Sequence, residues 1–83
     1  MAIEDFCCGD LVKVTGLAVE FTPEDANLFG RKRIDQRKDG AKGVVVSKLV
    51  GVGSSRWRDF LVVCHCATDD VAVYSPDELV KLD

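Results

Sequence analysis

Short runs of β-branched and aromatic residues, each bounded by turn residues, recur along the whole of this chain. Runs of this length and composition are typical of β-strands. In the first run, Val12 and Val14 fall on one face and Lys13 on the other, which is the pattern of a half-buried strand. The sequence therefore predicts an all-β, or mainly β, fold with strands near 11–16, 43–50, 57–66, 71–74 and 79–82.

The length of the chain suits one small domain. Eighty-three residues are too few to form two domains with separate hydrophobic cores, so we expect a single domain over 1–83. The longest apolar runs, such as 60–64, are far shorter than the roughly 20 residues that cross a bilayer, and no secretory signal follows Met1. We therefore expect a soluble, cytoplasmic protein that has no membrane partner.

Two short segments carry helix signals. Thr22 can cap a helix, Pro23 suits its first position, and Gly30 can end it one or two turns later. Ser75 and Glu78 are three residues apart and match a capping box at the start of a helical or 3₁₀ turn. We therefore predict one or two short helical turns.

Charge is unevenly distributed along the chain. The net charge is −3, but the segment 31–42 has six bases and two acids, so it carries +4 and leaves −7 on the rest. This segment has only two apolar residues, and we predict a long surface loop there. A basic loop can contact the phosphates of a nucleic acid. The candidate contacts are Arg31, Lys32, Arg33, Arg37, Lys38 and Lys42.

The order of the segments resembles the SH3-like small β-barrel superfold, including its KOW-type nucleic-acid-binding and ribosome-binding members. The resemblance covers most of the chain and depends on three segments, GDLVKV at 9–14, GAKGVVV at 40–46 and SPDELVKL at 75–82. It implies a small five-stranded SH3-like barrel with a long first loop and one or two short helical turns. It implies no particular function, because the superfold hosts many unrelated ones.

An aromatic residue flanked by arginines, Arg56-Trp57-Arg58, begins the most hydrophobic predicted strand. By alternation, Trp57 lies on the same face as Leu61, and Phe60 lies on the opposite face. We expect the Phe60 face to form the core, and the other face to be covered by the long loop, by a bent strand or by a partner. Because Trp and Arg are common interface anchors, we predict that Trp57, Arg56 and Arg58 bind a partner.

The single histidine and the four cysteines are the candidates for metal binding or nucleophilic catalysis. Neither cysteine pair has Cys-x-x-Cys spacing, and His65 points to the opposite strand face from Cys64 and Cys66. We therefore expect reduced thiols and a structural histidine, with no metal, no cofactor and no catalytic site. A zinc site or a Cys–His pair is the less favoured alternative, and it would use Cys7, Cys8, Cys64, His65 and Cys66.

These observations favour a non-enzymatic protein-interaction module, a small accessory protein of phage or bacterial type that docks on a larger protein or assembly. The alternative is a nucleic-acid-binding KOW-like barrel that uses the basic loop 31–42. The two hypotheses differ in whether the basic loop and the arginines beside Trp57 converge on one surface.

Overall fold

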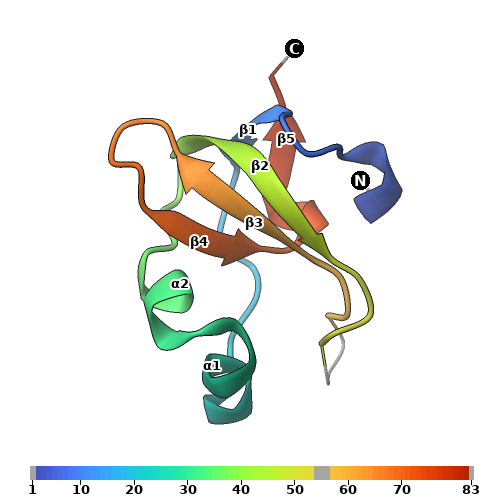
Figure 1. Ribbon diagram of the computed structural model, residues 1–83, viewed down its shortest axis with the longest axis vertical. Coiled ribbons are helices and arrows are strands. Elements are labelled where there is room, and N and C mark those ends of the chain that lie inside the picture. The colour runs from blue at the N-terminus through green and yellow to red at the C-terminus, as the bar shows by residue number, and fades with distance from the viewer. Residues whose placement is uncertain (1, 54–56, 83) are drawn as a thin grey trace.

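The computed structural model describes residues 2–53 and 57–82, and a five-stranded antiparallel sheet lies at its centre (Figure 1). The strand order is β4-β3-β2-β1-β5. The mainly β prediction is confirmed, and each strand lies within or close to a predicted run. The strands are β1 (Leu11–Val14), β2 (Lys42–Leu49), β3 (Phe60–His65), β4 (Val71–Tyr74) and β5 (Leu79–Lys81).

Short helices connect and precede the strands. The described helices are α1 (Pro23–Phe29) and α2 (Arg31–Asp35) between β1 and β2, and the 3₁₀ helices η1 (Ile3–Asp5) and η2 (Pro76–Glu78). The two predicted helical turns are confirmed as α1 and η2, whereas η1 and α2 were not predicted. In α1, the Thr22 side chain accepts the Asp25 N–H, and the Asp25 carboxylate accepts the Thr22 N–H. Within the part of the chain that the structure describes, no helix is both long and apolar enough to span a bilayer.

The prediction of an unbroken surface loop over 31–42 is wrong in its first half, because Arg31–Asp35 forms α2. Gly30 separates α1 from α2 with a φ of 93°, a left-handed conformation that favours glycine. Arg and Lys are good helix formers. The partly buried Ile34 packs against core residues and holds α2 in place.

The observed sheet is open. Its edge strands are β4 and β5, and in the described residues no ladder pairs one with the other. The register of β2 with β3 shifts between Val45 and Ser47, which leaves Val46 at an exposed bulge. Such a bulge bends its strand and changes which residues face each side of the sheet.

Two apolar clusters bury both faces of β3. The prediction that the Phe60 face forms the core needs correction, because Leu61 and Val63 on the opposite face belong to the larger cluster. Phe60 belongs to a second cluster, which includes Val19 and Phe29 from the segment between β1 and β2. That segment therefore covers the Phe60 face of β3, whereas the sequence predicted a covering on the opposite face. The larger cluster consists of Ile3, Phe6, Val12, Val14, Val45, Leu61, Val63, Ala72, Tyr74 and Leu79.

Candidate functional site

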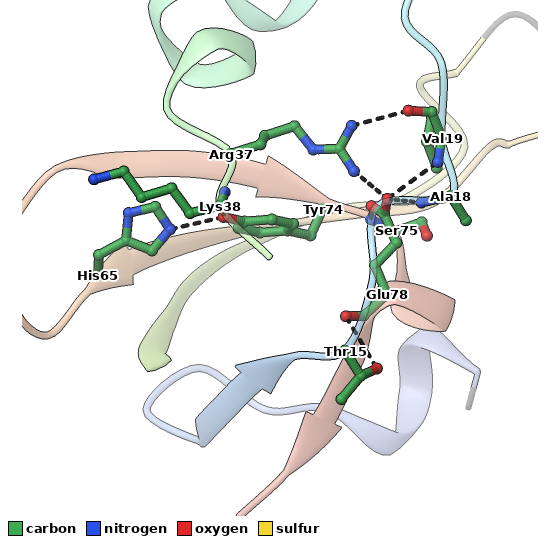
Figure 2. Close-up of polar contacts among 9 residues, drawn as sticks. All are labelled: Thr15, Ala18, Val19, Arg37, Lys38, His65, Tyr74, Ser75 and Glu78. Atoms are coloured by element: carbon green, nitrogen blue, oxygen red, sulfur yellow. Dashed lines mark hydrogen bonds and ion pairs between the residues drawn. The ribbon is translucent and has the colours of Figure 1, made fainter. Parts of the chain in front are cut away.

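A buried carboxylate at the end of η2 ties the segment after β1 to the sheet (Figure 2). Glu78 Oε2 accepts the N–H groups of Ala18 at 2.7 Å and Val19 at 3.0 Å, and it also pairs with the Arg37 guanidinium. Glu78 Oε1 accepts the Ser75 N–H at 2.9 Å, as a capping box requires. One side chain thus satisfies backbone donors from two distant parts of the chain.

Arg37 is part of this buried network. Its side chain is only 6% exposed, and besides the ion pair with Glu78 it donates to the Val19 carbonyl at 3.0 Å. Its guanidinium carbon lies 4.7 Å from the centre of the Phe21 ring and 5.3 Å from that of Tyr74. Of the six bases predicted to contact nucleic acid, Arg37 is therefore the one whose charge is neutralised inside the fold.

A second polar chain links Tyr74 to the turn between β3 and β4. The Tyr74 hydroxyl accepts the Lys38 N–H at 2.8 Å and lies 2.7 Å from His65 Nε2, while His65 Nδ1 pairs with Asp70 (Figure 2 shows the first two contacts). The hydroxyl oxygen already accepts a hydrogen bond from the Lys38 N–H, so the Tyr74 O–H can donate a hydrogen bond to His65 Nε2. In this arrangement the ring hydrogen is on Nδ1, and Nδ1–H donates to Asp70. Burial raises the pKa of the Tyr74 phenol, and the hydrogen bond with His65 lowers the pKa of the Asp70 carboxyl.

This second chain has the chemistry of a structural clamp. His65 is 3% exposed, and both of its ring nitrogens have partners within the protein. A general base must reach the proton of a substrate, and neither nitrogen is placed to do so. The network instead holds the backbone at Lys38 against β3 and β4.

The cysteines lie at or near the surface as free thiols. Cys7, Cys8 and Cys66 are exposed, and Cys64 is partly buried. Among residues 2–53 and 57–82, no three side chains of histidine, cysteine, aspartate or glutamate come together as a metal site would require.

Five of the six predicted bases remain at the surface. Lys32 and Arg33 of α2 line an open pocket of about 440 Å³, and Asp69 and Asp70 from the β3–β4 turn line the same space. Charges of both signs therefore face this pocket. The exposed bases are Arg31, Lys32, Arg33, Lys38 and Lys42.

Trp57 and Arg58 line a different pocket, of about 330 Å³, together with residues of the N-terminal segment and η2. Trp57 is partly buried and packs against the second cluster, whereas Arg58 is exposed. Arg56 lies outside the described residues. The Trp57 pocket shares no lining residue with the pocket beside α2, so Lys32 and Arg33 line a different space from Trp57 and Arg58.

One half of a sheet face is left uncovered by the chain itself. On β1, Leu11 and Lys13 point outward while Val12 and Val14 are buried. Leu11 pairs with Val44 of β2 and accepts the Leu82 N–H after β5, and Lys13 pairs with Lys42 on one side and Val80 on the other. Residues directly opposite each other in a sheet share a face. We call this surface the open face; it consists of Leu11, Lys13, Lys42, Val44, Val80 and Leu82.

The open face continues a side of the sheet that is covered elsewhere. Val44 pairs with Cys64, which is on the same side of β3 as Phe60. Phe60 is buried beneath the segment between β1 and β2, and Figure 1 shows α1 and α2 on the β4 side of the molecule, away from β5. On the uncovered half, Leu11 is 40% exposed, and Val80 and Leu82 are each 39% exposed.

The open face has no signature in the sequence alone. Alternation in β1 correctly placed Leu11 opposite the buried valines, but only the pairing of β1 with both neighbours brings Val44, Val80 and Leu82 beside it. No protein-family model, curated protein sequence or solved structure matches this chain.

Proposed function

We propose that this protein is a non-enzymatic interaction module that docks on a larger protein or assembly through its open face. The observation that carries the proposal is the uneven covering of one sheet side. The chain buries the β3 half under its own residues but leaves three large aliphatic side chains of the β1–β5 half about two-fifths exposed. Apolar side chains gathered on one face are typical of sites that another molecule covers.

The order of elements supports an SH3-like barrel as the scaffold. A long segment follows β1, a hairpin joins β2 to β3, and a 3₁₀ helix precedes β5. In this proposal the open sheet curls so that β4 and β5 approach each other, as the edges of a small barrel do.

The surroundings of His65 support a role without catalysis. The histidine is buried, and its two nitrogens are bonded to Tyr74 and Asp70. In the described part of the chain, no cysteine is hydrogen-bonded to that ring, so the Cys–His alternative has no geometric support.

The test is affinity purification of the tagged protein from its native cell, with and without nuclease. We expect a partner to be captured by the wild type and lost with the Leu11→Ser/Leu82→Ser variant. Leu28→Ser is the matched control, because Leu28 is an exposed leucine on α1 and lies outside the open face. Equal capture by all three proteins, at equal melting temperatures, would contradict the proposal.

The same experiment can include Trp57→Ala. Loss of the partner without a change in melting temperature would support the predicted contact by Trp57 and Arg58. A loss of roughly 3–5 kcal/mol in the free energy of unfolding would instead identify Trp57 as a core residue.

Nucleic-acid binding is the second candidate function. The observation in its favour is that five bases within the segment 31–42 are exposed. In this case the affinity for nucleic acid falls steeply as the salt concentration rises, because each phosphate contact releases counterions. Nuclease treatment then removes the captured material.

A further inference from the structure

Two lysines stand directly opposite each other on the open face. Lys13 of β1 pairs with Lys42 of β2, and both are exposed. Side chains in such positions have Cβ atoms roughly 5 Å apart, and like charges there destabilise the sheet. Among residues 2–53 and 57–82, neither ammonium group has an ion pair with a carboxylate.

The lysine pair borders the apolar residues of the same face. Leu11 lies two residues before Lys13 on β1, and Val44 lies two residues after Lys42 on β2, so the two rows are about 7 Å apart. One row therefore offers apolar contact through Leu82, Leu11 and Val44. The adjacent row offers two uncompensated positive charges.

We propose that the occupant of the open face is a segment of another protein in which apolar side chains stand beside a pair of carboxylates. This inference depends on the proposed docking function and specifies the chemistry of the partner. The apolar side chains cover Leu11 and its neighbours, and the carboxylates neutralise Lys13 and Lys42. Docking then offsets the repulsion between the two lysines, and this stabilisation is present only in the complex.

A second copy of this chain is a poor occupant. A symmetric dimer buries the same patch of both subunits, so it would bring four lysines of the two open faces into one interface. The six residues that define the open face include no carboxylate to compensate them.

A nucleic acid complements only one of the two rows of the open face. Its phosphates can neutralise Lys13 and Lys42, but they leave the Leu11 row without an apolar partner. The overall charge of −3 does not prevent an acidic segment from binding. At physiological salt the Debye length is about 8 Å, so the two nearby lysines outweigh more distant acids.

The experiment uses the full-length, isotope-labelled protein and two capped eight-residue peptides, one a Leu-Asp repeat and the other a Leu-Lys repeat. We expect the Leu-Asp peptide to shift the amide resonances at 11–13, 42–44 and 80–82, and the Leu-Lys peptide to leave them unchanged. The Lys13→Glu/Lys42→Glu variant is expected to bind the Leu-Asp peptide roughly tenfold more weakly. Lys32→Glu/Lys38→Glu is the matched control and should retain wild-type affinity.

Several results would overturn the acidic-partner proposal. These are equal binding of both peptides, no shift with either, unchanged affinity in Lys13→Glu/Lys42→Glu, and shifts confined to α2. Stronger shifts at 11–13 with an oligo-dT strand would favour nucleic acid instead. Concentration-dependent shifts at the same amides without any peptide would indicate a second copy.

The capture experiment separates this inference from the docking function. If the natural partner is lost with Leu11→Ser/Leu82→Ser but kept with Lys13→Glu/Lys42→Glu, docking stands and the acidic partner is wrong. If both variants keep the partner, docking through the open face fails as well.

Discussion

Glu78 and Arg37 form an ion pair that is almost completely buried. Removing two charges from water is costly, and their attraction offsets that cost only when further hydrogen bonds satisfy them. Here the carboxylate also accepts backbone N–H groups at Ala18, Val19 and Ser75, and the guanidinium reaches the Val19 carbonyl. These bonds hold residues that lie outside any helix or strand.

We expect Glu78→Gln to lower the free energy of unfolding by about 3–5 kcal/mol, because it leaves the Arg37 charge buried and unpaired. Urea denaturation measures the change. Glu20→Gln is the control, since Glu20 is exposed and its replacement should change stability by about 0.5 kcal/mol or less. The double variant Glu78→Gln/Arg37→Met should recover part of the loss, because it removes the unpaired charge and keeps an amide oxygen that can accept the backbone N–H groups. A loss of Glu78→Gln no larger than that of the control would contradict this account.

At the level of single residues, local sequence signals predicted the capping interaction of Glu78 but not its ion pair. Its spacing from Ser75 predicted a capping interaction, and that hydrogen bond is present. The bond to Arg37 has no local signal, because the two residues come together only when the segment after β1 folds back on the sheet. The same basic residue had been predicted to lie on a surface loop.

Among the elements, β2 connects the two environments of the sheet. Val44 lies on the open face, Val45 is in the larger cluster, and Leu49, beyond the bulge, packs against the second cluster. Gly43 permits the close approach of β2 to β3. A Cβ atom at this position would lie 2.6 Å from the Cys64 carbonyl oxygen and would overlap the Val63 side chain.

Gly43→Ala should therefore destabilise the protein by roughly 1–3 kcal/mol, since the strands must separate to admit the methyl group. The melting temperature reports this loss. Val46→Ala changes an exposed residue at the bulge of the same strand and should have a much smaller effect. An alanine variant at Gly43 as stable as the wild type would show that β2 and β3 are less tightly packed than described.

The elements with local signals were the ones that could be predicted. Alternation identified β1, Thr22 and Pro23 identified α1, and Ser75 and Glu78 identified η2. The helix α2 has no side-chain N-cap bond and is held by packing around Ile34, which is a tertiary effect. Val46, at the bulge, is the last of three consecutive valines. The sequence there has no alternation of apolar and polar residues from which a change of register could be predicted.

At the scale of the whole molecule, one side of the sheet is covered by the chain over one half and exposed over the other half, which is the open face. The segment between β1 and β2 covers the β3 half, and α2 packs beside the edge strand β4. The other edge strand, β5, borders the open face. An edge strand beside exposed aliphatic side chains is a place where another chain can associate.

The open face could not be predicted from the sequence because it depends on long-range pairing. Leu11 and Leu82 come from opposite ends of the chain and become neighbours only through the β1–β5 ladder. Lys13 and Lys42 likewise belong to different strands, and only Lys42 lies in the basic segment 31–42. Which residues share a face was predictable within a strand, whereas which strands lie side by side was not.

The most direct measurement is hydroxyl-radical footprinting of the protein, free and in the complex captured from its native cell. Docking through the open face predicts that labelling of Leu11, Val80 and Leu82 falls severalfold in the complex, while labelling of Leu28 on α1 stays the same. Protection of Leu28 or of the bases on α2, with Leu11 and Leu82 labelled as strongly as in the free protein, would contradict the account.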